Sequence, residues 1–111
     1  MAVTEYTTPF KRDKKGICSY WLANQAANDC IPVWLKKGTM VLPDDKKTPL
    51  IMIGPGTGVA AFVSFIQELS GIDGPQLVLI YGSRDAEKDY YYGDEWEQIP
   101  NLKVITAFSR T

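Results

Sequence analysis

The pattern of hydrophobic and polar positions changes near the middle of the chain. From residue 50 onward, short and almost continuously apolar runs alternate with amphipathic stretches. These runs predict strands over residues 50–53, 76–81 and 102–108, a helix over 57–69, and helical structure at least over 94–98. Strands that alternate with helices indicate an α/β fold with a parallel sheet and crossover helices. Because the strands are apolar nearly throughout, we expect helices to cover both faces of that sheet.

The first 43 residues have a different pattern, which predicts β-like structure with one short helix. We expect strands over residues 2–6, 32–36 and 39–42, a charged loop over 11–15, and a helix over 16–24. Trp21 and Trp34 are most simply interpreted as core residues of this part.

A linker separates the two patterns. Pro43 and Pro49 enclose charged residues and no apolar side chain. We therefore expect the end of a β-rich domain over residues 1–43, a linker over 44–49, and the first half of an α/β domain over 50–111. Only three parallel strands are recognisable, whereas a doubly wound sheet usually has five or more, so we expect a fragment or a truncated product.

The composition of the chain argues against several classes of function. The chain has 111 residues, a formal net charge of −1, 45% hydrophobic residues and 23% charged residues. This balance is typical of a globular protein and argues against a nucleic-acid partner. No apolar run approaches a membrane span of about 20 residues. The two cysteines, Cys18 and Cys30, form no disulfide framework, and we expect a cytoplasmic location. Histidine is absent, so we expect no metal site and no acid–base side chain, and any redox chemistry must come from a cofactor.

A glycine-rich turn between a predicted strand and a predicted helix is the first candidate site. It consists of Gly54, Pro55, Gly56, Thr57 and Gly58. The absent lysine rules out a Walker A loop, and Val59 stands where a dinucleotide fingerprint has glycine. The turn either links strand to helix or presents free N–H groups to a phosphate, and the Thr57 hydroxyl could cap the helix or contact that phosphate.

A second candidate opens the short helix of the first part. Its residues are Gly16, Ile17, Cys18 and Ser19, which follow a basic segment. A diphosphate could lie at this helix N-terminus. The alternative is an ordinary surface helix behind a solvated charge run.

Two further candidates follow the second and third parallel strands. Arg84 could clamp a phosphate through its guanidinium group, or form a salt bridge with Asp85 or Glu87. Ser109 and Arg110 suit a phosphate monoester, which favours NADP over NAD, or form a polar tail.

Aromatic residues gather just after the second of these strands. Tyr90, Tyr91, Tyr92 and Trp96 stand among carboxylates. They either form a rim around a ligand or partner, or cover the edge of the sheet.

Several motifs agree, in order and spacing, with one family. They occupy residues 16–22, 53–60, 65–68, 81–84, 89–96 and 107–110. The chain resembles the ferredoxin–NADP+ reductase-like module of diflavin NADPH reductases, of the NADPH–cytochrome reductase and NADPH-dependent diflavin oxidoreductase type. This resemblance implies the end of an FAD-binding β-barrel over 1–43, followed by the first half of a doubly wound, parallel-sheet NADP-binding domain over 50–111.

The resemblance also implies roles for the candidate residues. Residues 16–19 would contact the FAD diphosphate, and residues 54–58 would lie under the NADPH diphosphate. Ser109 and Arg110 would bind the 2′-phosphate, with Arg84 in the same cofactor site. NADPH would pass hydride to FAD, and electrons would continue to FMN in a flavodoxin-like partner domain or to another acceptor.

Departures from the family pattern keep an alternative open. Ala61, Val63 and Ser83 stand where the family usually or often has proline, arginine and cysteine. The family's upstream flavin motif and later segments are missing. The alternative is a truncated, non-catalytic module that binds a nucleotide or a partner weakly; the absent P-loop lysine disfavours an NTPase.

Overall fold

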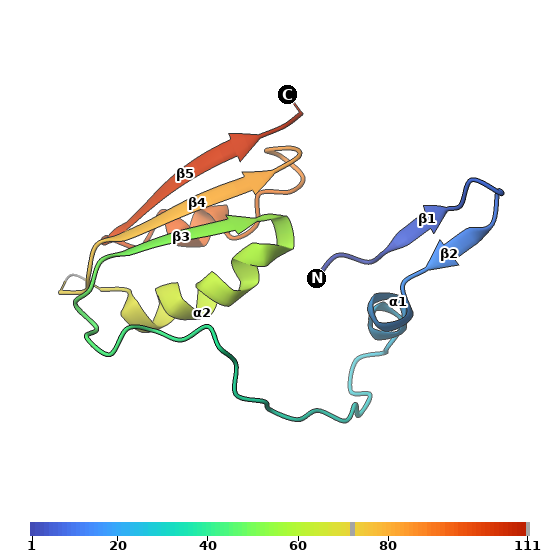
Figure 1. Cartoon of the computed structure of the whole chain (residues 1–111), viewed down its shortest axis with the longest axis horizontal. Helices are drawn as coiled ribbons and strands as arrows, with labels where there is room; N and C mark the ends of the chain where they lie inside the picture. Colours follow the sequence, from blue (N-terminus) through green and yellow to red (C-terminus); the bar gives the residue numbers. More distant parts are fainter. Residues whose placement is uncertain (72, 111) are drawn as a thin grey trace. The chain divides into compact units, whose positions relative to one another are not determined.

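The chain folds as two compact units, Met1–Gly38 and Thr39–Thr111. The structure is a computed structural model that describes residues 1–71 and 73–110 (Figure 1). The units differ in how much apolar surface they bury. Every buried hydrophobic side chain among the described residues belongs to the second unit. Within this described part, none of the helices is long and apolar enough to cross a membrane.

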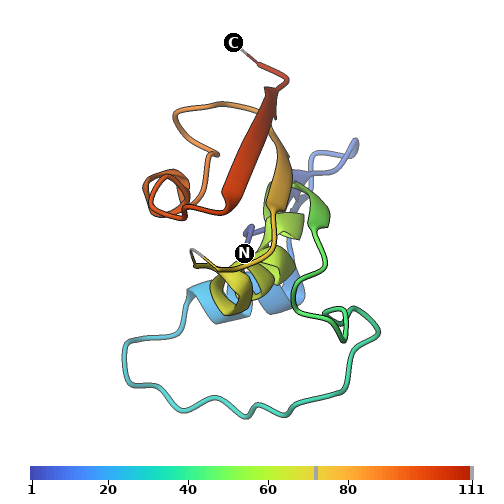
Figure 2. The ribbon, with the colours of Figure 1, turned by 90° about the vertical axis from the view of Figure 1, so that its left-hand side faces the viewer.

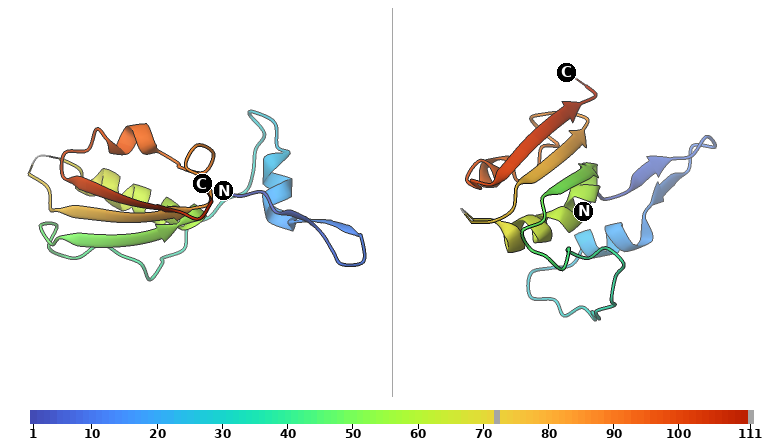
Figure 3. Two further views of the ribbon diagram at one scale, coloured as in Figure 1. Left: turned by 90° about the horizontal axis from the view of Figure 1, so that it is seen from above. Right: turned by 60° about the vertical axis from the view of Figure 1, so that its left-hand side comes forward.

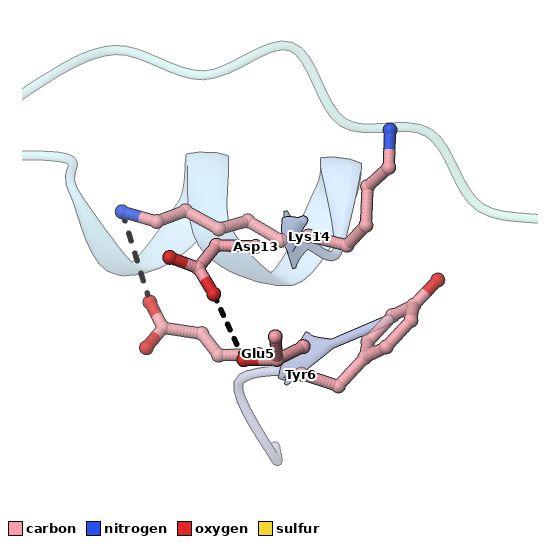
Figure 4. A pocket seen from close by; sticks show the side chains of 6 residues that line it. Glu5, Tyr6, Asp13 and Lys14 are labelled. Atoms are coloured by element: carbon pink, nitrogen blue, oxygen red, sulfur yellow. Dashed lines mark hydrogen bonds and ion pairs between the residues drawn. The ribbon is translucent and has the colours of Figure 1, made fainter. Parts of the chain in front are cut away.

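A small hairpin and a helix make up the ordered part of the first unit. Strand β1 (Glu5–Thr7) pairs antiparallel with β2 (Asp13–Lys15), with Tyr6 opposite Lys14, and helix α1 (Ile17–Ala23) follows. The expected charged loop therefore ends in a strand, because its last residues find β1 as a partner. Cross-strand polar pairs support this pairing (Figure 4). The Thr7 hydroxyl donates to the Asp13 carboxylate at 2.8 Å, and Lys15 Nζ lies 4.0 Å from Glu5 Oε1.

The strands expected over residues 32–36 and 39–42 do not form. Residues 31–43 have no regular secondary structure, and no described segment pairs with them. A strand is stable only when neighbouring strands take up its backbone hydrogen bonds, and none does so here. Trp34 is therefore 74% exposed and Trp21 is half-exposed. The prediction that both are core residues is wrong.

The second unit contains a three-stranded parallel sheet. Its strands are β3 (Leu50–Pro55), β4 (Leu77–Ser83) and β5 (Leu102–Phe108), in the order β3-β4-β5. Met52, Leu79 and Val104 stand in register across the sheet. The predicted α/β fold is confirmed, with β5 at the expected residues and with β3 and β4 extending two residues further at their carboxyl ends.

Helical segments cover one face of the sheet. The short 3-10 helix η1 (Gly56–Val59) leads into α2 (Ala60–Leu69), and α3 (Gly93–Trp96) lies before β5. Both α-helices lie on the same side of the sheet (Figure 2), where Leu77, Leu79 and Tyr81 are fully buried. Two crossovers that move in one direction across a sheet, each with the usual right hand, place their helices on the same side.

The opposite face of this sheet is apolar but open. Ile51, Ile53 and Ile105 are exposed there, and no other described segment of this unit packs on them. The expectation that helices cover both faces is therefore not met within the described residues. The alternating burial along β3 is the direct result.

The edge of the sheet where the strands begin is held by one amide side chain. Asn101 Oδ1 accepts the Gly71 N–H at 3.0 Å, and Asn101 Nδ2 donates to the carbonyls of Leu69 at 3.0 Å and Pro75 at 2.7 Å. A Cβ on Gly74 would lie only 2.4 Å from the Leu69 carbonyl oxygen. The connection from α2 to β4 is thus tied to the start of β5.

Candidate functional site

The carboxyl ends of β3, β4 and β5 meet at one edge of the sheet (Figure 3). Three of the predicted segments stand there: the glycine-rich turn after β3, Arg84 after β4, and Ser109 with Arg110 after β5. In open α/β sheets this is the edge at which ligands bind.

The three glycines of the turn have different structural roles. A Cβ on Gly54 would lie 2.9 Å from Val59 Cα and 3.0 Å from the Phe62 ring, so this glycine lets the helical segment pack closely on β3. Gly56 has φ +53°, a conformation that favours glycine, and nothing lies within 4 Å of its added Cβ. Gly58 meets only Pro55, at 3.7 Å. Gly56 and Gly58 therefore leave the backbone open to a ligand.

The helical segment begins without a side-chain cap. Pro55 is the N-cap residue of η1, and no side chain bonds to the first N–H groups. Thr57 is exposed and does not act as the cap, so that alternative does not apply. The N–H groups of Gly56 and Thr57, the first two of this 3-10 helix, have no partner within it and are available to an anion.

Backbone hydrogen bonds bring the other two segments together. The pairing of β4 with β5 continues past the ends of both strands, because the Ser109 N–H donates to the Ser83 carbonyl at 3.1 Å and the Arg110 N–H donates to the Arg84 carbonyl at 2.8 Å. Arg84 and Arg110 are therefore direct neighbours across the sheet edge. Both residues are exposed.

The predicted salt bridge of Arg84 with Asp85 or Glu87 does not form. Asp85 instead caps the next turn, where its Oδ1 accepts the Glu87 N–H at 2.9 Å, and its Oδ2 lies 3.6 Å from Lys88 Nζ. Neither Arg84 nor Arg110 forms an ion pair with any residue in the described part of the chain.

A cluster of aromatic rings lies beneath this edge, and Tyr92 joins it through Trp96 at 5.9 Å between ring centroids. Tyr90 is 5.6 Å from Tyr81, 5.6 Å from Trp96 and 6.0 Å from Phe108, measured between ring centroids. The Tyr81 hydroxyl donates to the Asp89 carbonyl. Burial raises the pKa of the Tyr81 and Tyr90 phenols, and nearby Glu97 raises that of Tyr90 further.

The two alternatives for this aromatic region were a rim around a ligand and a cover over the sheet, and the most buried rings cover the sheet. Trp96 is buried and Tyr90 is half-buried, so these two rings pack on the sheet, while Tyr91 and Tyr92 remain partly exposed. That Tyr81 and Phe108 belong to this cluster was not predicted from the sequence. Their position at the carboxyl ends of predicted strands was the available signal.

The second candidate, Gly16 to Ser19, belongs to the first unit. The Ser19 hydroxyl oxygen accepts the Thr4 N–H at 3.1 Å, and a Cβ on Gly16 would lie 2.9 Å from Thr4 Cβ. This glycine therefore permits close packing at the start of α1. Ile17 and Cys18 are exposed.

The basic residue next to this segment is already engaged. Lys15 Nζ donates to the Tyr20 hydroxyl at 2.8 Å, and this hydrogen bond raises the pKa of the lysine. The same hairpin borders a hollow of about 290 Å³ lined by Glu5, Tyr6, Thr7, Asp13, Lys14 and Lys15 (Figure 4). Among its charged side chains, Lys15 pairs with Glu5, and Asp13 accepts the hydroxyl of Thr7.

The second unit has the sequence signature of a known family. The model of the oxidoreductase NAD-binding domain matches residues 52–110, which include the glycine turn, Arg84, Ser109 and Arg110. The chain belongs to this family of oxidoreductase NAD-binding domains.

Among individual proteins, the chain is similar to NADPH-dependent diflavin oxidoreductase 1 of several organisms. It is 44% identical to the protein of Xenopus laevis over 115 residues and 42% identical to that of Danio rerio over 116 residues. Each match covers 99% of this chain, but 19% and 20% of the respective relative. The chain thus spans about a fifth of the length of these relatives, and the predicted resemblance to part of a diflavin reductase module is confirmed.

Solved structures show the same fold. Ferredoxin-NADP+ reductase from Plasmodium falciparum with 2′P-AMP has a TM-score of 0.73 at 21% identity, and a single-site variant of it has 0.76 at 22%. Each match covers 96% of this chain and 46% of the matched reductase chain. At this identity the likeness concerns the fold alone.

Proposed function

We propose that this chain is part of a flavoprotein oxidoreductase that oxidises NADPH through FAD and passes electrons to FMN or another acceptor. The observation that carries the proposal is the sheet edge of an oxidoreductase NAD-binding domain. There an uncapped glycine turn stands with two arginines that form no ion pair among the described residues. The relatives named NADPH-dependent diflavin oxidoreductase support the same reaction.

In this proposal the glycine turn holds the NADPH diphosphate. Its residues are Gly54, Pro55, Gly56, Thr57 and Gly58. The open backbone at Gly56 and Gly58 fits this role, because a phosphate must approach the N–H groups closely. The Thr57 hydroxyl is exposed and available to donate to a phosphate oxygen.

Ser109 and Arg110 bind the 2′-phosphate of NADPH, with Arg84 as a second positive charge beside them. A guanidinium group forms paired hydrogen bonds to a phosphate, and neither arginine has a carboxylate partner among the described residues. The similar reductase of Plasmodium falciparum was solved with 2′P-AMP, which supports a site for a 2′-phosphorylated adenosine.

The flavin role assigned to Gly16, Ile17, Cys18 and Ser19 rests on the family resemblance. The Ser19 hydroxyl accepts one hydrogen bond and retains its own hydrogen for a phosphate oxygen. FAD, when bound, supplies the hydride-accepting chemistry, which no side chain of this chain provides. An FMN-containing, flavodoxin-like domain is the proposed electron acceptor.

A binding measurement tests the nucleotide site. The 111-residue chain is titrated calorimetrically with 2′P-AMP and with 5′-AMP. We expect 2′P-AMP to bind roughly tenfold more tightly or better, since a charge-assisted phosphate contact contributes about 1.5–3 kcal/mol. Equal affinity for the two ligands would contradict the proposed 2′-phosphate site.

A second measurement tests the flavin role. The chain is mixed with FAD, passed through a desalting column, and exposed to NADPH without oxygen. Retained flavin whose visible absorbance bleaches supports a competent reductase. Absence of retained flavin, together with 2′P-AMP binding, supports the alternative of a non-catalytic nucleotide-binding module.

A further inference from the structure

The Tyr90 ring lies between the two segments that carry the arginines. On one side it belongs to the connection that begins at Arg84, and on the other it packs edge-to-face on Phe108, at 6.0 Å and 86°. Phe108 is the last residue of β5 and directly precedes Ser109 and Arg110. One aromatic contact therefore joins the two halves of the proposed phosphate site.

The connection from Arg84 to Tyr90 is folded back onto β4. The Asp89 N–H donates to the Asp85 carbonyl at 3.0 Å, and the Asp89 carbonyl accepts the hydroxyl of the buried Tyr81. Tyr90 follows immediately, with its ring against Tyr81 and Trp96. The position of this ring thus fixes where the connection ends.

The backbone around Tyr90 is shaped to hold the ring. A Cβ on Gly93 would lie 2.7 Å from Tyr90 Cε1, so the glycine at the start of α3 leaves room for it. Within the described part of the chain, the Tyr90 hydroxyl forms no hydrogen bond. Its contribution is therefore made by the ring rather than by the hydroxyl.

We propose that Tyr90 is a positioning residue for the 2′-phosphate site: its contact with Phe108 supports the backbone pairing that places Arg84 beside Arg110. This inference rests on the proposed NADPH function. Tyr90 itself contacts no ligand and acts through Phe108 and through the connection that begins at Arg84. Loss of the ring loosens this pairing, which weakens a ligand that needs both arginines more than one that lacks the 2′-phosphate.

The test compares the ratio of affinities for 2′P-AMP and 5′-AMP in four proteins. They are the unmodified chain, Tyr90→Leu, Tyr90→Phe, and Tyr91→Leu as a matched control in which a half-exposed tyrosine outside the ring cluster is changed. We expect Tyr90→Leu to lower the ratio about threefold to tenfold, in line with the loss of aromatic pair contacts. Tyr90→Phe and Tyr91→Leu should keep the ratio of the unmodified chain. A purely structural defect lowers both affinities together and leaves the ratio unchanged.

Phe108→Leu removes the same contact from the other side and leaves the rest of the cluster in place. It should lower the ratio as Tyr90→Leu does. If Tyr90→Leu does not fold, Phe108→Leu is the variant that tests the inference. An unchanged ratio in a folded Tyr90→Leu or Phe108→Leu protein, or an equal loss in Tyr91→Leu, would overturn the inference. If the unmodified chain itself does not prefer 2′P-AMP, the proposed function fails and this inference fails with it.

Discussion

The backbone N–H of Arg110 donates a 2.8 Å hydrogen bond to the carbonyl of Arg84. This bond lies beyond the last residues of β4 and β5, so the sheet continues for one more pair just where its strands end. Two guanidinium side chains that are 26 residues apart in sequence therefore start from adjacent backbone positions. The continued pairing of the two backbones is what brings these side chains together.

Arg110→Ala should weaken NADPH binding much more than NADH binding. Removal of a guanidinium–phosphate contact should cost tenfold or more in NADPH affinity, by roughly 1.5–3 kcal/mol, and should leave NADH nearly unaffected. The affinities can be measured by calorimetry, in this chain or in a longer protein that contains it. Arg12→Ala is a suitable control, because it removes the same charge from the hairpin turn of the first unit. A loss of equal size for both nucleotides would contradict the 2′-phosphate role.

Gly54→Ala should destabilise the second unit by about 2 kcal/mol, which is within the range for an overpacked site. The added methyl group meets the Val59 backbone at 2.9 Å, and a backbone atom cannot move away cheaply. Urea unfolding followed by circular dichroism gives the free energy of unfolding. Gly58→Ala is the control, since its methyl group meets only Pro55 at an ordinary 3.7 Å. Equal stability of the two variants would be inconsistent with the close packing of β3 on the helical segment.

Asn101→Ala should lower the free energy of unfolding by about 2–3 kcal/mol, because it leaves the Gly71 N–H and the carbonyls of Leu69 and Pro75 without their partner. Asn24→Ala is a matched control that removes a single exposed bond to the Tyr20 carbonyl. It should cost less than about 1 kcal/mol. A small effect of Asn101→Ala in urea unfolding would show that water replaces these bonds readily.

Stability should decline in alkaline solution because of the buried phenols. Burial raises the pKa of Tyr81 above its ordinary value of 10.0, so the folded state keeps a proton that the unfolded state releases. The stabilisation is fully present below pH 10 and is lost as the pH rises through the folded-state pKa. Tyr90 contributes in the same direction.

Thermal unfolding between neutral pH and strongly alkaline pH measures this decline. Tyr81→Phe should flatten the alkaline part of the curve, although it also loses the hydrogen bond to the Asp89 carbonyl and about 1 kcal/mol at neutral pH. Tyr6→Phe, at an exposed ring of the hairpin, should leave the curve unchanged. If Tyr81→Phe and the unmodified chain decline in parallel, another group is responsible.

The sheet could be predicted from the sequence because its strands carry their own signal. Apolar runs such as residues 77–81 have few other stable environments, and the alternation with a helix determines that the strands are parallel. The glycine turn was also recognisable, because Gly54, Gly56 and Gly58 interrupt the chain between strand and helix. The same pattern located the edge at which Arg84 and Arg110 meet.

Features that depend on a distant partner could not be predicted. Val33, Trp34 and Leu35 have the residue types of a strand, but a strand also needs a neighbour, and composition carries no information about one. Likewise, the choice of Asp85 between Arg84 and Lys88 depends on how the turn closes. The ring contact of Tyr90 with Phe108 joins residues from different elements, and neither position is distinctive alone.

The tryptophans differ in burial, so their fluorescence can follow the unfolding of this chain. Trp96 is 3% exposed, whereas Trp21 and Trp34 are 51% and 74% exposed. A tryptophan that passes from an apolar interior to water shifts its fluorescence to longer wavelength, while one already in water changes little. The emission change on unfolding therefore comes mainly from Trp96, and it follows the cluster beneath the two arginines without an added label.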